Sequence, residues 1–315
     1  MAGLRAHGWT VDVHPPAALA AIADGTCVVV DGLALGTIPD DVEREKSRLR
    51  LVALMHLPLA EEVGLDPAIA ARLEASERRA LAACVFSIVT GAGTARTLER
   101  YGISRDRIAV IEPGTPPGPN ARGSGGPSVH VICVAAVTRG KGHEILVDAL
   151  ARVPSDKWAL TCAGSLDRDP ATVERVRASL RGHALGNHVT LVGELDAPAI
   201  SNLYDRADLF ASATQHETYG MAVAEALARG LPVIGTQTGA IPDLVGSDAG
   251  IVVPVGDVGA LATALAHAID DAPLRARLAA GARRVRDRLP TWDSAVDKMV
   301  SVLEPIVRDG RVAPF

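Results

Sequence analysis

The sequence is poor in aromatic residues, since Phe, Trp and Tyr together make up 3% of its 315 residues. Proteins that bind RNA or single-stranded DNA commonly stack bases on aromatic side chains, so this scarcity argues against such a surface. Basic residues are not in excess either, because 32 Lys and Arg stand against 37 Asp and Glu and leave a net charge of -5. We therefore expect no nucleic-acid partner.

Cysteine and long hydrophobic runs are also scarce. Each of the four cysteines lies in or beside a short apolar run, and none has the spacing of a CxxC pair or a His/Cys zinc site. We expect no metal site and a reducing compartment. No stretch approaches the roughly 18 apolar residues of a membrane helix, and the first residues lack the apolar core of a signal peptide. The sequence therefore predicts a cytoplasmic protein without an integral membrane segment.

What the sequence does contain is an alternation of short, β-branched apolar runs with longer segments of helical period. The runs begin with WTVDVH (residues 9–14) and end with AGIVVPV (residues 249–255). Near-continuously apolar strands between helices are typical of parallel sheets that are covered on both faces. We therefore predict a doubly wound α/β protein whose ligands bind at the carboxyl ends of strands.

A stretch rich in Pro, Gly and Ser, Thr115–Ser128, divides the chain and carries no periodicity. It predicts a first Rossmann-like domain over residues 1–118 and a linker over 119–128. A second Rossmann-like domain follows over residues 129–290, and we expect a cleft between the two. An amphipathic C-terminal helix is predicted within residues 291–315 and is expected to pack back toward the first domain.

The most informative segment carries two glutamates eight positions apart, Glu217 and Glu225. The first follows a predicted strand, and the second lies within a predicted helix that Thr218 would cap. A helix N-terminus binds anions through its free N–H groups and its dipole. The N–H groups of that open first turn would belong to Tyr219, Gly220 and Met221. Two glutamates alone are more often solvated helix residues, so the neighbouring residues decide between the two interpretations.

Those neighbours read ETYGMAVAEALARGLPVIGTQTGAIPDLV (residues 217–245). The segment resembles the donor-binding pattern of retaining, GT-B-fold glycosyltransferases of family 4, roughly E-G-[FY]-G-x4-E-A-[LM]-A-x-G-x-P-V followed by G-G-x-P-E-x-V. The resemblance continues upstream through VGELDAPAISNLYDRADLF and downstream through AGIVVPVGDVGALATAL, so it covers essentially the whole second domain. Thr218 replaces a common Gly, and Asp243 replaces a common Glu.

The resemblance implies a GT-B fold and a role for each matching residue. Glu225 would bind the ribose of a nucleotide diphosphate sugar. Glu217 would contact hydroxyls of the transferred sugar and stabilise positive charge at its anomeric carbon. The amides of Tyr219–Met221 would face the sugar and diphosphate, and Gly193 and Glu194 would lie near the base.

A second matching segment, VAAVTRGKGHEILVDAL (residues 134–150), places Arg139 and Lys141 in a glycine-containing turn before a helix. Two cations at a helix N-terminus suit a diphosphate leaving group. The family usually has V-G-R-L-x-x-x-K-G here, which Lys141 and Gly142 match. Ala136 occupies the usual arginine position, so Arg139 is the candidate substitute. A surface turn with solvated cations is the alternative, and it is the stronger one for Arg139.

The first half carries fewer signals. His56 ends a predicted strand and begins an H-x-P-L segment. The family resemblance implies that His56 contacts the sugar or the acceptor, whereas a structural histidine would be the preferred interpretation without it. Gly91 and Gly93 open a helix as in a dinucleotide-binding turn, but Arg96 stands at the third glycine position. We therefore do not expect nicotinamide binding.

The sequence starts with residues that look like the tail of the first GT-B helix and the second strand, so the opening strand and its glycine-rich turn are expected to be missing. Either the start is assigned downstream of the true one, or the protein has lost this element. The leading hypothesis is a retaining glycosyltransferase that uses no metal and no cofactor, with Glu217, His56 and Lys141 in catalysis. Its acceptor is an unidentified sugar, small molecule or lipid-linked compound. The alternative is a catalytically impaired nucleotide-sugar-binding partner protein with a degenerate first domain. A nucleotide-sugar epimerase has less support, because the glutamate segment resembles transferases more closely.

Overall fold

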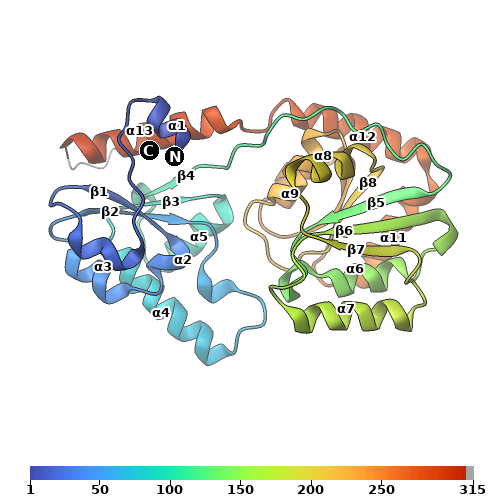
Figure 1. The fold of residues 1–315 in the computed structure, drawn as a ribbon, viewed down its shortest axis with the longest axis horizontal. Coiled ribbons are helices and arrows are strands. Elements are labelled where there is room, and N and C mark those ends of the chain that lie inside the picture. Colours follow the sequence, from blue (N-terminus) through green and yellow to red (C-terminus); the bar gives the residue numbers. More distant parts are fainter. Residues whose placement is uncertain (310–315) are drawn as a thin grey trace. The chain divides into compact units, whose positions relative to one another are not determined.

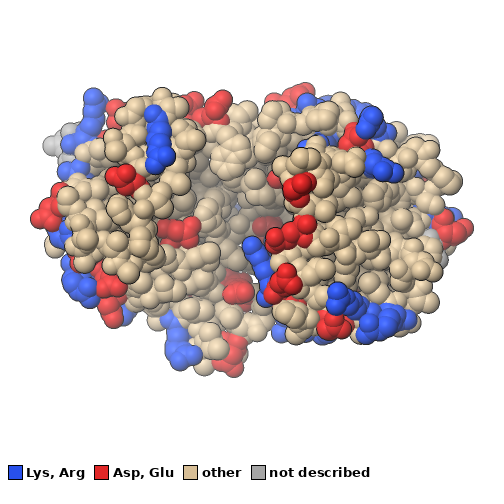
Figure 2. All heavy atoms as spheres, viewed as in Figure 1, with Lys and Arg blue, Asp and Glu red and all other residues tan. Residues whose placement is uncertain are grey.

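The computed structural model describes residues 1–309 and divides into two compact units (Figure 1). Unit 1 consists of residues 1–114 together with the C-terminal segment from Pro290, and unit 2 consists of Thr115–Leu289. Basic and acidic side chains are interspersed over the visible face of both units (Figure 2). None of the helices described within residues 1–309 combines the length and the hydropathy needed to cross a membrane.

Unit 1 is built on a four-stranded sheet in which all neighbouring strands are parallel. The strand order is β1-β2-β3-β4, so each strand pairs with the one that follows it in the chain. The strands are β1 (Cys27–Asp31), β2 (Arg50–Met55), β3 (Phe86–Val89) and β4 (Ile108–Val110). Each connection between them therefore passes over a face of the sheet, as parallel pairing requires.

Helices cover this sheet on both faces. Alternate residues of β2 enter two separate cores: Leu51, Ala53 and Met55 belong to one, and Val52 belongs to the other. The helices of unit 1 are α1 (Ala2–Ala6), α2 (Gly32–Leu35), α3 (Pro39–Glu45), α4 (Pro67–Ala83), α5 (Ala92–Arg100) and α13 (Trp292–Asp309), with 3-10 turns at Pro16–Ala21, Leu59–Glu61 and Arg105–Arg107.

The C-terminal helix α13 fills one of the two cores of unit 1. Its buried residues Val302, Leu303 and Ile306 pack with residues of β2 and β3. The guanidinium of Arg50 donates to the carbonyl of Ile306 at 3.1 Å and thereby ties the helix to the start of β2. Residues 310–315, which the sequence prediction included in this helix, lie outside the described residues.

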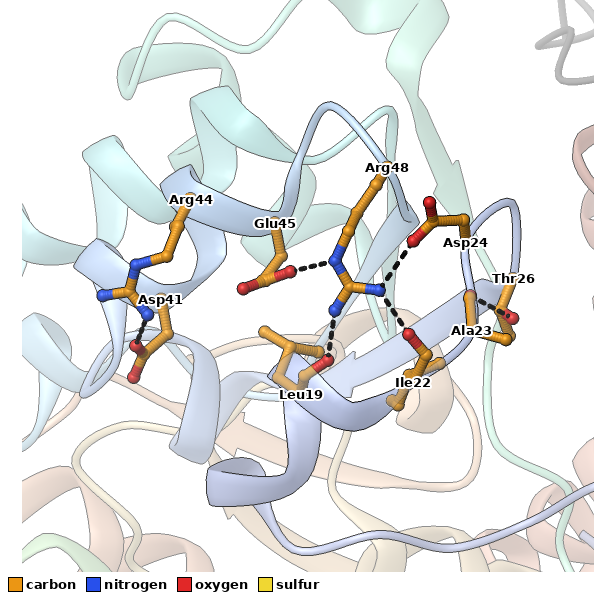
Figure 3. Close-up of polar contacts among 9 residues, drawn as sticks. All are labelled: Leu19, Ile22, Ala23, Asp24, Thr26, Asp41, Arg44, Glu45 and Arg48. Carbon is orange, nitrogen blue, oxygen red and sulfur yellow. Dashed lines mark hydrogen bonds and ion pairs between the residues drawn. The ribbon is translucent and has the colours of Figure 1, made fainter.

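Arg48 joins the segment before β1 to the end of α3 (Figure 3). Its guanidinium donates to the carbonyls of Leu19, at 2.9 Å, and Ile22. It also pairs with the carboxylates of Asp24, at 3.1 Å, and Glu45. A planar guanidinium has five donors, so a single side chain can satisfy polar groups of both segments.

The first run, WTVDVH, is not a strand, although the sequence predicted one. Residues 9–15 form neither helix nor strand, and Val13 is 67% exposed. Apolar alternation produces a strand only where a sheet edge pairs with the backbone, and β1 pairs with β2 alone. The remaining runs all contain the strands that they predicted.

Unit 2 is built on a six-stranded parallel sheet of order β10-β9-β8-β5-β6-β7. The central strand β5 has β6 on one side and β8 on the other, so the direction of winding reverses there. The strands are β5 (Val129–Val134), β6 (Trp158–Ala163), β7 (Val189–Gly193), β8 (Leu209–Ser212), β9 (Val233–Thr236) and β10 (Gly250–Val253).

Two cores cover the faces of this sheet. Val131 and Cys133 of β5 pack with one set of helices, whereas Ile132 packs with the other. The first set is α6 (His143–Leu150), α7 (Pro170–Gly182) and α11 (Val258–Asp270). The second set is α8 (Ala197–Asp205), α9 (Met221–Ala228), α10 (Ile241–Val245) and α12 (Ala272–Arg286). Further 3-10 turns span Arg139–Lys141 and Ser155–Lys157.

The stretch predicted as a linker is hydrogen-bonded to unit 2. The amide of Ala121 donates to the carbonyl of Arg229 at 2.8 Å, and the amide of Arg122 donates to the carbonyl of Asp205 at 2.8 Å. The side chains of Arg122 and Asp205 also form an ion pair. This stretch is therefore extended but attached to unit 2.

We predict that Gly281→Ala lowers the free energy of unfolding of unit 2 by about 1–3 kcal/mol, because a Cβ on this helical glycine would lie 1.8 Å from the carbonyl oxygen of Asp248. Urea denaturation measures the change. The control is Gly182→Ala at the end of α7, where no atom lies within 4 Å of the new Cβ. That variant should match the wild type or exceed it by up to about 1 kcal/mol. Equal stability of the two variants would contradict the packing described here.

Candidate functional site

The loops that follow β5 and β8 meet at the point where the sheet of unit 2 reverses its winding. The carbonyl of Gly140 accepts hydrogen bonds from the amide of Gln215 at 2.7 Å and from the hydroxyl of Thr214 at 3.1 Å. In open α/β sheets, ligands bind outside the carboxyl ends of the strands at such a point. The segments at residues 134–150 and 217–245, which the sequence analysis singled out, therefore meet where a ligand is expected.

Lys141 and Glu217 form an ion pair across this junction. The ammonium of Lys141 donates to Oε2 of Glu217 at 2.7 Å, and the side chains are 34% and 20% exposed. The other oxygen of Glu217 accepts from the amide of Thr218 at 3.1 Å. The carboxylate is thus held at the junction with its charge balanced by Lys141.

Two glycines let the backbone segments of the junction approach each other closely. Gly142 has φ +68°, and a Cβ there would lie 2.0 Å from the carbonyl oxygen of Ala213. Gly239 has φ +56°, and a Cβ there would lie 2.1 Å from the carbonyl oxygen of Glu217. Side chains other than hydrogen do not fit these positions, so the glycines allow the loops after β5 and β9 to pass close to the loop after β8.

The helix after Glu217 begins later than the sequence predicted. Its N-cap is Gly220, with φ +94°, and its first residue is Met221. Thr218 is therefore not the cap, because the left-handed backbone at Gly220 breaks the helix before Met221. The open first turn starts at Met221 rather than at Tyr219, whose side chain is buried.

Glu225 is fixed by a tyrosine that the sequence analysis missed. The hydroxyl of Tyr204 lies 3.0 Å from Oε2 of Glu225 and is directed at that carboxylate. Burial, and secondly the charge of Glu225, raise the pKa of Tyr204 well above its ordinary value, so the hydroxyl remains a donor. Its ring stacks on Phe210 at 6.3 Å, and the guanidinium of Arg229 lies 5.1 Å from its centre.

A hollow of about 370 Å³ opens at the carboxyl ends of β5, β6 and β7. Glu194 lines it, and Gly193 precedes Glu194 with φ +74°. Arg139 is not among its lining residues, although the amide of Arg139 donates to Asp169 beside it at 3.3 Å. The lining includes Ala136, Ser165, Arg168, Glu194, Leu195 and Ile200.

In unit 1, His56 follows β2 and lies beside Asp31 at the end of β1. Nε2 of His56 is 3.5 Å from Oδ2 of Asp31, and both side chains are about half exposed. The carbonyl of His56 accepts from the hydroxyls of Thr90 at 3.4 Å and Thr94 at 3.5 Å. The pair therefore lies at the carboxyl ends of neighbouring parallel strands.

The loop that follows His56 is held by a buried carboxylate. Glu77 of α4 is fully buried and accepts from the amides of Leu59 at 2.5 Å and Ala60 at 3.4 Å. Burial raises the pKa of Glu77 above its ordinary value, although the two amide donors oppose this rise. Within residues 1–309, no three His, Cys, Asp or Glu side chains are grouped so that they could hold a metal ion.

Comparison with known families identifies the class of protein to which the chain with this candidate site belongs. The family described as glycosyl transferases group 1 matches residues 120–285, which is more than half of the chain. The chain belongs to this family. The chain has the GT-B fold: it contains two parallel sheets, and it is similar in structure to solved glycosyltransferases of that fold.

Individual relatives support this family assignment. A D-inositol 3-phosphate glycosyltransferase from Xylanimonas cellulosilytica is 31% identical over 219 residues, which is 64% of this chain and 52% of the relative. Among solved structures, sucrose-phosphate synthase from Thermosynechococcus elongatus has a TM-score of 0.77 at 22% identity and covers 89% of this chain and 73% of its own. Anabaena HepE with UDP and glucose has a TM-score of 0.73 at 19% identity, over 88% of this chain and 77% of its own.

The chain spans about half the length of the curated family members that it matches. The sequence predicted Lys141, Glu217 and Glu225 as site residues because the family pattern is local. The structure brings Lys141 and Glu217 together, and the functional roles of all three stay predictions. Sequence reasoning missed residues that act through tertiary contact: Tyr204, Asp31 and Glu77 carry no local signal. Arg168 could have been found, because it follows a predicted strand at the sheet edge where ligands bind.

We predict that the raised pKa of Glu77 makes the unfolding free energy of unit 1 depend on pH. At low pH the carboxyl of Glu77 is protonated in both the folded and the unfolded protein. As the pH rises above about 4, this carboxyl ionises first in the unfolded protein. The contribution of Glu77 to stability is therefore present at low pH and is lost as the pH rises through its pKa in the folded state.

Glu77→Gln cannot titrate and serves as the reference. The unfolding free energy of the wild type minus that of Glu77→Gln should fall as the pH rises above about 4, as measured by urea denaturation at several pH values. A difference that stays constant or rises with pH would show that the pKa of Glu77 is not raised.

Proposed function

We propose that this protein is a retaining glycosyltransferase that uses a nucleotide diphosphate sugar and needs no metal or cofactor. The observation that carries the proposal is the ion pair of Lys141 with Glu217 beside the open first turn of α9. This arrangement offers cationic and N–H donors for a diphosphate, together with a carboxylate for a sugar. The names of the relatives support the donor class, since HepE is described with UDP and with UDP-glucose.

The donor half of the reaction is assigned to unit 2. Glu225, which Tyr204 holds in place, accepts hydrogen bonds from the hydroxyls of the ribose. The N–H groups at the start of α9 and the ammonium of Lys141 stabilise negative charge on the departing diphosphate. Glu217 contacts the transferred sugar and stabilises positive charge at the anomeric carbon.

The chemical step exchanges one bond to the anomeric carbon for another. The bond from this carbon to the diphosphate oxygen breaks, and its electron pair leaves with the phosphate. The acceptor hydroxyl attacks from the same face, and its proton passes to the departing phosphate. Retention of the anomeric configuration follows from attack on that face.

His56 is proposed to contact the sugar or the acceptor, and Asp31 is proposed to orient its ring. A carboxylate beside an imidazole fixes the direction of the ring and favours one tautomer. The first acceptor to test is D-inositol 3-phosphate, because it appears in the name of a relative at 31% identity. Sugar and lipid-linked acceptors are the next to test.

We predict that a matching donor raises the melting temperature of the wild type by about 5 °C at about 100 times its Kd. UDP-, GDP- and ADP-sugars are screened by thermal shift. Glu225→Ala should abolish the shift, because the ribose loses its acceptor. The control Glu174→Ala removes an equal charge from α7, where the carboxylate contacts Arg177 at 2.7 Å, and should keep the full shift. A full shift with Glu225→Ala would mean that the donor binds elsewhere.

We also predict that Glu217→Gln binds the donor but transfers its sugar about 100-fold more slowly, because the neutral amide stabilises less positive charge. Transfer is measured by release of the nucleoside diphosphate, and the anomeric configuration of the product by NMR. An inverted product would refute the retaining mechanism. Donor binding with neither transfer nor hydrolysis by the wild type would instead support the catalytically impaired binding protein.

A further inference from the structure

We propose that Arg168 binds the diphosphate of the donor and supplies the cation that Ala136 lacks. The inference rests on the proposed function, since it names a ligand contact for the same donor site. Ala136 occupies the position where the family pattern has an arginine. In the structure Arg168 and Ala136 line the same hollow. The loop after β6 therefore supplies a cation near the position that Ala136 occupies after β5.

The other two cations of the region are less well placed for this role. The ammonium of Lys141 is already paired with Glu217 at 2.7 Å. Arg139 is exposed on the 3-10 turn before α6 and does not line the hollow. Arg168, by contrast, forms no hydrogen bond or ion pair through its guanidinium within the described part of the chain, so its donors are available to a ligand.

The loop that carries Arg168 is attached on both sides to the neighbouring turns. The amide of Val137 donates to the carbonyl of Ser165 at 2.9 Å, and the amide of Gly164 donates to the carbonyl of Gly193 at 2.8 Å. After Arg168, the carboxylate of Asp169 accepts from the amides of Arg139 at 3.3 Å and Thr172 at 3.0 Å. The backbone of Arg168 is therefore held next to the turn that bears Arg139 and Lys141.

The chemistry of the hollow favours a phosphate on the Arg168 side. A guanidinium matches two phosphate oxygens with parallel N–H donors, which makes it a strong partner for a diphosphate. Glu194 lines the same hollow and repels phosphate, so it suits donor groups on the base or sugar instead. The hollow of about 370 Å³ lies within the size range of small-molecule sites.

The test measures Kd by calorimetry, first for UDP, GDP and ADP with the wild-type chain. For the tightest of these, Arg168→Ala should weaken binding by about tenfold or more, because a charge-assisted hydrogen bond is lost. Arg168→Lys keeps the charge but not the paired N–H donors, so its loss of affinity should not exceed that of Arg168→Ala. Arg181→Ala, an equal charge change at the far end of α7, should bind within about twofold of the wild type.

The outcomes separate this inference from the proposed function. If the wild type binds none of the three diphosphates, the proposed function fails. If the wild type binds one and Arg168→Ala binds it within twofold, the assignment of Arg168 is wrong while the proposed function stands. If Arg168→Lys weakens binding as much as Arg168→Ala, the paired N–H donors of the guanidinium carry the contact, whereas a smaller loss shows that the charge alone contributes; both results agree with a phosphate ligand. The melting temperatures of the free variants should equal that of the wild type, because the side chain is exposed.

Discussion

The candidate donor site depends on one topological constraint, the reversal of winding at β5 in the sheet of unit 2. Because β6 and β8 lie on opposite sides of β5, the loops after β5 and β8 leave the sheet side by side. The carbonyl of Gly140 then joins them through two hydrogen bonds. This juxtaposition brings Lys141 and Glu217, which are 76 positions apart, into a single ion pair. Without the reversal, β6 and β7 would lie between the strands that carry the two charged residues.

The features that the sequence predicted well are those that a local pattern carries. Apolar runs located the strands of both sheets. Glu217 and Glu225 were singled out as candidates because their spacing and the intervening glycine lie within one short segment. In each of these cases, the residues that determine the structure are neighbours in the chain.

The features that the sequence did not predict depend on distant residues or on backbone conformation. Residues 9–14 alternate like a strand, but no sheet edge pairs with them. The start of α9 differs from the prediction because Gly220 adopts a left-handed conformation that its identity permits but does not require. The carboxylates of Glu77 and Glu225 take their partners from other elements of their units, which no spacing along the chain reveals.

The contact between Tyr204 and Glu225 has a consequence for selectivity. Burial and stacking on Phe210 hold the ring of Tyr204, and its hydroxyl in turn restricts the carboxylate of Glu225, so part of the loss of side-chain entropy is incurred during folding rather than during binding. When a ligand lacks the matching hydroxyl, a preorganised carboxylate cannot change rotamer to find another partner, so its hydrogen bond is lost. With Glu225 as the proposed ribose ligand, the site should therefore discriminate ribonucleotide donors from their 2′-deoxy counterparts more sharply than a mobile glutamate would.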